Sequence, residues 1–247
     1  MRTFNNDPSL KADLIRQLKH HQELDAFVRG KWLTGDTISG NGRRGCFYGC
    51  TMQTEHNPRE AFSEKYHMDL MYVYLTERIF EGLPDNEYKT YPVRSIECVP
   101  VGFDFNKIKS PFFHALLMDK EHGVINFYNG NKPAEAAIRQ IAELFTVDFD
   151  KIDKKAALAA AWAVERASDA ALAAVWSAAW VSEAEAAGWA VRAAARAVWM
   201  AARAAHSAER AAQAVWMAAR AARAADNQPA HYTWMANLLF ELIEKNK

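Results

Sequence analysis

Residues 57–86, NPREAFSEKYHMDLMYVYLTERIFEGLPDN, decide the fold class of this chain. Pro58 suits the first turn of a helix. Apolar side chains then recur at every fourth position, which is the spacing of one helix face, at Phe62, Tyr66, Leu70 and Tyr74. Gly82 and Pro84 supply a stop signal. The stretch therefore predicts one amphipathic helix over residues 58–82.

The segments on either side carry the same helical signals. Asp7 can cap the free backbone N–H groups of a helix that begins at Pro8, and leucines follow at four-residue spacing, which predicts a helix over residues 8–29 with Gly30 as its stop. Further helices are predicted over residues 106–120 and 133–146. Residues 91–101 are punctuated by prolines, and there we favour a short helix over a strand.

Residues 154–225 are dominated by alanine, the residue with the highest helix propensity, and contain no proline. The segment 197–205, AVWMAARAA, is repeated at 214–222. We predict a helical hairpin or bundle with a break near Gly188, and a final helix over residues 230–244. The fold class is therefore mainly α, with a mixed-composition helical part over residues 1–150 and an Ala/Trp/Arg-rich part over residues 151–247.

Composition excludes several classes of protein. Half of the residues are hydrophobic, and 30 basic residues balance 30 acidic ones, so the formal net charge is zero. Neutrality argues against general nucleic-acid binding. An odd count of 3 cysteines suits a reducing compartment. No signal peptide and no apolar stretch long enough to span a membrane is evident, so we predict a cytoplasmic protein.

Glycines cluster in a predicted loop over residues 30–50, and two arginines stand among them. Backbone N–H groups in glycine-rich turns can bind anions, and arginine adds paired donors, although an ordinary surface loop is the simpler interpretation. The P-loop ending is missing. The residues that we expect to contact a ligand in and after this loop are Arg43, Arg44, Cys50, Thr51 and His56.

A second candidate surface lies on the alanine-rich part. Arginines at positions 192, 196, 203 and 210 cluster on one face of a helix, with Trp199 beside them. Arginine together with tryptophan suits an anion with a flat face, such as a nucleotide, whereas a solvated helix face is the alternative. Arg196 and Trp199 are therefore secondary candidates for ligand contact. Tyr66 and Arg78 are two further secondary candidates.

Metal and thiol chemistry are weaker alternatives. Cys46, Cys50, His56 and His67 are residue types that zinc accepts, but their spacing matches no standard finger, so no metal and no cofactor is expected. Cys50 could act as a nucleophile with His56 or His67 as its base. Glu77 and Asp104 could serve as acid or base, although isolated carboxyls are weak evidence.

The motif Gly45-Cys46-x-x-Gly49-Cys50-Thr51, the segment Ile79–Pro84, the turn Val99–Gly102 and the alanine/tryptophan tail together resemble a group of uncharacterised phage and bacterial proteins. The group carries no activity to transfer. A phage origin implies one class of hypothesis, because many small phage proteins counter host immunity, some by sequestering nucleotide second messengers.

The function that we expect is therefore non-catalytic sequestration of a small anionic, nucleotide-like ligand, in a phage counter-defence role. One alternative is a protein–protein interaction module that binds or inhibits a host protein, or that forms a homo-oligomer, since exposed tryptophan and arginine are common interface anchors. The second alternative is a small enzyme that depends on cysteine or histidine.

Overall fold

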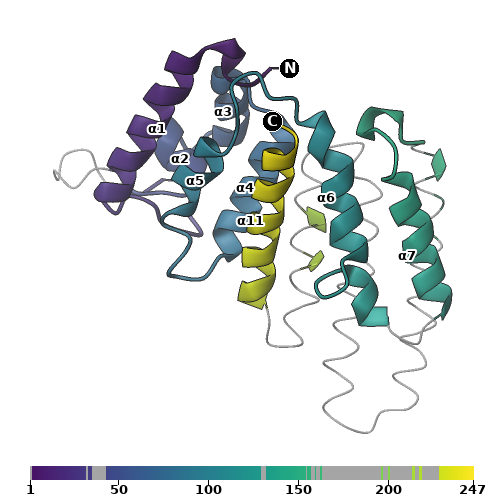
Figure 1. Cartoon of the computed structure of the whole chain (residues 1–247). Helices are drawn as coiled ribbons and strands as arrows, with labels where there is room; N and C mark the ends of the chain where they lie inside the picture. The colour runs from purple at the N-terminus through teal and green to yellow at the C-terminus, as the bar shows by residue number, and fades with distance from the viewer. Residues whose placement is uncertain are drawn as a thin grey trace, which may run out of the picture. The chain divides into compact units, whose positions relative to one another are not determined.

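The computed structural model describes residues 2–31, 33–34, 43–128, 132–153 and 228–247, together with isolated positions between 155 and 218. The described residues are mainly helical, which confirms the predicted fold class (Figure 1). They divide into two compact units: residues 1–105 with 243–247 form unit 1, and residues 106–242 form unit 2. The change in composition at residue 151 thus falls inside unit 2, and the predicted alanine-rich hairpin lies almost wholly outside the described residues.

Helix α1 (Pro8–Glu23) begins as predicted, because the Asp7 side chain accepts a hydrogen bond from the Ser9 N–H at 2.8 Å. Its predicted end at residue 29 is wrong. The chain leaves the helix at Glu23, and Asp25 adopts a left-handed φ of 50°. The following residues turn their backbone groups toward Gly45 instead of continuing the helical ladder: the Val28 N–H donates to the Gly45 carbonyl at 2.7 Å.

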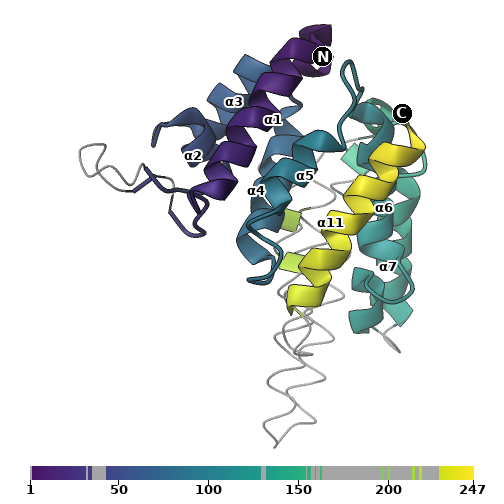
Figure 2. The same cartoon turned by 60° about the vertical axis from the view of Figure 1, so that its left-hand side comes forward.

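Backbone hydrogen bonds between residues 26–31 and residues 45–46 join the two ends of the glycine-rich loop. The Gly45 N–H donates to the Ala26 carbonyl at 3.0 Å, and the Cys46 N–H donates to the Lys31 carbonyl at 2.7 Å. The chain then enters α2 (Phe47–Met52), which lies next to α1 (Figure 2). Residues 35–42, within the predicted anion-binding loop, lie outside the described residues.

The stretch 57–86 folds as two helices, α3 (Pro58–Tyr66) and α4 (Leu70–Gly82), rather than as the single helix that its periodicity predicted. The break begins at His67, whose φ of 50° is left-handed and ends α3. Asp69 then starts α4, since its side chain accepts from the backbone N–H groups of Met71 at 3.0 Å and Tyr72 at 3.3 Å. The four-residue spacing does not mark one buried stripe across the break: Phe62 and Tyr66 of α3 are buried, whereas Leu70 of α4 is 36% exposed and Tyr74 is half-buried.

Aromatic rings from α2, α3 and α4 form the centre of unit 1. The Phe47 ring is fully buried, and its centroid lies 4.2 Å from that of Tyr48 and 6.0 Å from that of Phe62. Phe80 of α4 reaches the same ring at 6.5 Å. Aromatic pairs at these separations stabilise a core beyond the area that they bury. The three helices are therefore held around one aromatic cluster.

The predicted short helix near residue 91 is confirmed as α5 (Tyr91–Glu97), which lies alongside α1 in Figures 1 and 2. The Tyr72 hydroxyl donates to the Ser95 carbonyl at 2.6 Å and ties α4 to α5. The 3-10 helix η1 (Thr3–Asn6) is joined to the turn after α5, where the Thr3 hydroxyl donates to the Pro100 carbonyl at 2.7 Å.

Unit 2 contains α6 (Asn106–Met118), η3 (Val124–Tyr128), α7 (Lys132–Leu144) and η4 (Phe149–Lys151), and most of α11 (Gln228–Lys245). Helix α6 packs against α7 (Figure 1), and the rings of Phe113 and Phe145 meet at 5.4 Å between centroids. The ends of α6, α7 and α11 lie within one or two residues of the predicted ends. Within the part of the chain that the structure describes, no helix is both long enough and apolar enough to cross a membrane.

The cap at the start of α4 yields a stability prediction. Asp69→Ala removes the acceptor for two N–H groups of the first turn, and we expect it to lower the free energy of unfolding by about 1 kcal/mol. Asp69→Asn keeps an acceptor oxygen and is the matched control. Urea unfolding followed by circular dichroism measures both, and equal losses in the two variants would contradict a capping role.

Candidate functional site

Unit 1 carries a half-open cleft of about 310 Å³ beside α4, here called the α4 cleft. Side chains of opposite charge and one thiol share its wall, which consists of Gly30, Lys31, Cys46, Arg59, Glu77, Arg78 and Glu81. Three of these residues come from α4, one from α3, one from the N-terminal cap of α2, and two from the loop after α1. The cleft therefore gathers four separate parts of the chain.

Helical spacing explains the contribution of α4. Residues 77 and 81 are four apart and residues 78 and 81 are three apart, so the three side chains share one side of the helix. The remaining face of α4 is apolar and points into the core, with Val73, Ile79 and Phe80 fully buried. The apolar face fixes the rotation of the helix, and that rotation places the charged residues at the cleft.

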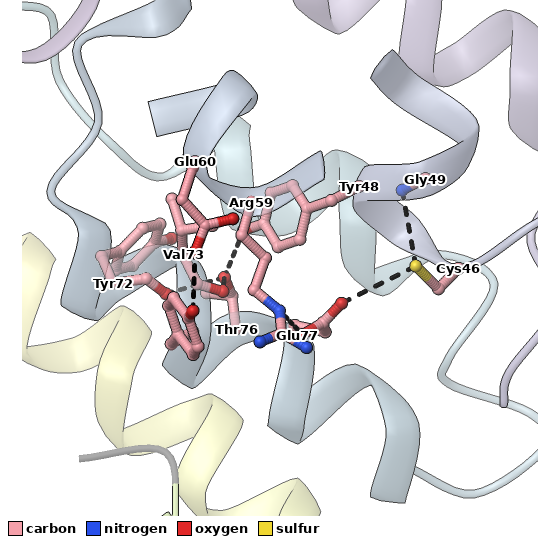
Figure 3. Close-up of polar contacts among 10 residues, drawn as sticks. Cys46, Tyr48, Gly49, Arg59, Glu60, Tyr72, Val73, Thr76 and Glu77 are labelled. Atoms are coloured by element: carbon pink, nitrogen blue, oxygen red, sulfur yellow. Dashed lines mark hydrogen bonds and ion pairs between the residues drawn. The ribbon is translucent and has the colours of Figure 1, made fainter. Parts of the chain in front are cut away.

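The Glu77 carboxyl is the buried centre of the site, with 8% of its side chain exposed. Arg59 of α3 forms an ion pair with its Oε2 atom. On the other oxygen, the Cys46 thiol donates to Oε1 at 3.7 Å. Figure 3 shows both side chains pointing toward the Glu77 carboxyl, while the Gly49 N–H donates to the Cys46 sulfur at 3.4 Å. Both carboxyl oxygens of Glu77 are thus engaged by the protein.

Burial dominates the electrostatics of Glu77. It raises the pKa of this carboxyl from 4.5 to about 7, although the Arg59 cation opposes the rise. Burial, together with the nearby Glu77 carboxyl, raises the pKa of the Cys46 thiol to about 12. At neutral pH Glu77 therefore populates both its charged and its neutral form, whereas Cys46 stays a thiol.

Arg59 also lies over the Tyr74 ring, with 4.4 Å between the guanidinium carbon and the ring centroid. The Tyr74 hydroxyl in turn donates to Glu60 at 2.7 Å. Farther along α4, the Tyr48 and Thr76 hydroxyls form a short hydrogen bond of 2.5 Å inside the core (Figure 3). These contacts hold the arginine and the helix that carries Glu77 in one arrangement.

Glu81 is the second carboxyl of the cleft. Its Oε2 atom accepts the Gly30 N–H at 2.7 Å, and burial raises its pKa. Gly30 adopts a left-handed φ of 77°, a conformation that glycine accepts without strain. The Cys46 N–H also donates to the Lys31 carbonyl. Residues 30 and 31 are therefore each hydrogen-bonded to a residue of the cleft wall.

The cleft has more cations than carboxyls. Lys31, Arg59 and Arg78 face Glu77 and Glu81, which gives a formal charge of +1 with both carboxyls ionised and +2 with Glu77 protonated. Arg59 is committed to Glu77. Lys31 is exposed and Arg78 is half-buried, and neither joins an ion pair among the described residues. Among the described residues, Arg59 is thus the one cation of the cleft that forms an ion pair.

Of the nine residues expected to contact a ligand, Arg78 lines this cleft. Arg44 is instead held by Asp25, to which its guanidinium donates at 3.0 Å. The Thr51 hydroxyl donates to the Phe47 carbonyl one turn earlier at 2.6 Å, and Tyr66 is buried in the core. Arg44, Thr51 and Tyr66 therefore have structural roles, and none of them lines the cleft.

The structure places no further candidate among the described residues that line the α4 cleft. His56 is exposed, Arg43 is half-buried without lining the cleft, and Arg196 is exposed. Trp199 lies outside the described residues, as do the other arginines of the predicted stripe. Among the described residues of unit 1, the candidates from the glycine-rich loop do not line the α4 cleft, and the ligand contacts predicted for the arginine stripe stay a prediction.

The structure places Cys50 beside a histidine that the thiol-enzyme alternative did not name. Its sulfur lies 3.5 Å from Nδ1 of His21 on α1, and neither His56 nor His67 is a described partner. Burial raises the pKa of the Cys50 thiol to about 11, and burial also lowers the pKa of His21. Among the described residues no three His, Cys, Asp or Glu side chains are grouped to hold a metal, so the zinc alternative gains no assembled site.

Sequence reasoning missed Lys31, Arg59 and Glu81, and noted Glu77 only as an isolated carboxyl. A signal was present on α4: two glutamates four residues apart with an arginine between them, on a helix whose other face is apolar. Arg59 gave no comparable signal, because its pairing with Glu77 depends on how two helices pack. Comparison of the chain with protein-family models, curated proteins and solved structures gives no match.

The burial of Glu77 predicts a pH dependence of stability. A carboxyl whose pKa rises from 4.5 to about 7 on folding contributes stability that is fully present below pH 4.5 and is lost as the pH rises through about 7. The loss is up to about 3 kcal/mol, since one pKa unit corresponds to about 1.4 kcal/mol. We expect Glu77→Gln to lose less stability than wild type between pH 5 and pH 8 in urea unfolding.

Glu64→Gln on α3 is the control for removing one carboxyl, because Glu64 is exposed. If Glu77→Gln and wild type lose equal stability over this range, Glu77 does not titrate as its burial implies.

The thiols yield a reactivity prediction. Cys46 and Cys50 are 2% and 0% exposed, and both have raised pKa values. Because the thiolate is the reactive form, iodoacetamide at pH 7.5 is expected to label both at least tenfold more slowly in the native protein than in guanidinium chloride. Peptide mass spectrometry measures the labelling. Rapid selective labelling of native Cys50 would favour the thiol-enzyme alternative.

Proposed function

We propose that this protein binds a small anionic, nucleotide-like ligand in the α4 cleft and holds it without chemical conversion. The observation that carries the proposal is the local excess of cations in the cleft of a chain whose net charge is zero. Arg59, the third cation of the cleft, is already paired with Glu77. Lys31 and Arg78 are therefore the two cations that we expect to bind the anion. A guanidinium binds phosphate or carboxylate through two parallel hydrogen bonds.

The dimensions of the cleft favour a small ligand. Its volume of about 310 Å³ is close to the lower end of the range of about 300–1,000 Å³ that is usual for small-molecule sites. A mononucleotide or a ligand of similar size suits this space, with the open side leaving room for a larger molecule to extend into solvent.

The thiol chemistry supports binding rather than catalysis. The pKa values of Cys46 and Cys50 are raised by burial to about 12 and about 11, so both remain thiols at neutral pH. Covalent catalysis by cysteine needs the thiolate. Glu77, whose carboxyl has a pKa of about 7, has both oxygens engaged by Arg59 and Cys46.

The resemblance to phage and bacterial proteins suggests a setting for such binding. A protein that holds a nucleotide tightly and leaves it intact lowers the free concentration of that nucleotide. Sequestration of a nucleotide signal, as a counter-defence protein would perform it, is the role that we propose.

Ligand binding predicts thermal stabilisation. A mononucleotide present at 100 times its dissociation constant is expected to raise the free energy of unfolding by about 2.7 kcal/mol. Arg78→Ala removes a charged donor and should weaken binding about tenfold or more, and added salt should weaken it further. Isothermal titration calorimetry with wild type and variant measures the affinity, and chromatography of the recovered nucleotide tests that it is unchanged.

Arg16→Ala is the matched control, because Arg16 is an exposed arginine of α1 that pairs with Asp13 outside the cleft. Equal weakening by the two substitutions would point to nonspecific charge attraction. The absence of any heat or stabilisation with all common mononucleotides would reject the proposed function.

A further inference from the structure

Glu81 is the less buried carboxyl of the α4 cleft, and its Oε1 atom accepts no hydrogen bond among the described residues. An ionised carboxylate has about four acceptor positions on its two oxygens. The described contact at Glu81 is the Gly30 N–H, which donates to Oε2 at 2.7 Å. Glu77 differs, since Arg59 holds one of its oxygens and Cys46 the other. The two glutamates of the cleft therefore have different roles.

The position of Glu81 constrains the chemistry of an anionic ligand. Glu81 is half-buried in a cleft that also holds Lys31 and Arg78, and a ligand with acceptor groups alone would face its carboxylate across a short distance. Like charges or facing acceptors in a partly desolvated site are unfavourable. A ligand that fits must bring N–H donors to Glu81 as well as an anion to the two cations.

Among the common nucleobases, guanine presents two adjacent N–H donors, N1–H and the 2-amino group, on one edge. Adenine and cytosine place a ring-nitrogen acceptor next to their amino group, and uracil places its single N–H between two carbonyl acceptors. A carboxylate matches the guanine edge through two parallel hydrogen bonds, in the manner of its pairing with arginine.

We propose that the ligand is a guanine nucleotide, with the N1–H and 2-amino edge bound by Glu81 and the phosphate bound by Lys31 and Arg78. This inference rests on the proposed function and adds the base specificity to it. Arg59 is not a ligand contact in this arrangement: it neutralises Glu77, so that Glu81 is the carboxylate presented to the base.

The test is calorimetric titration of the full chain at pH 7.5 with GMP, IMP, AMP and inorganic phosphate. IMP differs from GMP by the missing 2-amino group alone, so it should bind about tenfold more weakly, and AMP about a hundredfold more weakly. Inorganic phosphate should bind weakly, since it lacks the base.

Glu81→Gln separates the two halves of the site. The amide keeps an acceptor for Gly30 and offers a donor in place of the second acceptor, so the preference of GMP over AMP should fall at least tenfold while binding of inorganic phosphate is kept or strengthened. Glu64→Gln, on the exposed side of α3, should leave the preference unchanged. Thermal unfolding without ligand verifies that each variant folds.

Each outcome bears on one of the two proposals. Equal affinity for GMP, IMP and AMP that is lost in Arg78→Ala would overturn the guanine assignment and leave anion binding in the cleft standing. A preference for GMP that survives in a folded Glu81→Gln variant would also overturn the role of Glu81. Failure of every nucleotide to bind would overturn both, and the GMP-to-IMP comparison on wild type stays decisive even if Glu81→Gln does not fold.

Discussion

Burial of the Glu77 carboxyl is the constraint on which the rest of unit 1 depends. A buried carboxyl is costly unless charge or hydrogen bonds compensate it. Here the compensation comes from Arg59 on α3 and from the Cys46 thiol at the start of α2. The aromatic cluster around Phe47 holds the same three helices from the apolar side. Polar and apolar contacts together thus fix how α2, α3 and α4 pack against one another.

This packing of the helices requires the break between α3 and α4. In one continuous helix, residues 59 and 77 would lie about 27 Å apart, at about 1.5 Å per residue. The left-handed His67 and the Asp69 cap turn the chain, and the turn brings Arg59 into an ion pair with Glu77. The break that periodicity did not reveal is therefore the feature that creates the buried pair, and with it one wall of the cleft.

The loop after α1 completes the cleft through backbone contacts. Gly30 donates its N–H to Glu81, and Cys46 holds the Lys31 carbonyl, so the cation of Lys31 is carried to a wall built by α4. The result is a cleft with a committed ion pair at its buried side and two further cations and one carboxylate toward solvent. The ligand that we propose, with both an anion and N–H donors, matches this mixed arrangement and belongs to a narrower class than anions in general.

The sequence by itself determined the mainly helical class, the short helix at Tyr91–Glu97, and the longer helices to within a few residues at most ends, because helical periodicity and capping are local properties. The sequence also pointed to Glu77 as a possible acid or base and to Arg78 as a candidate ligand contact. Tertiary structure alone decided that Arg59 meets Glu77, that Gly30 meets Glu81, and that Cys50 faces His21 rather than His56. These pairs join residues 18, 51 and 29 positions apart. No local pattern encodes them, since they arise only when separate helices bury their apolar faces in one core.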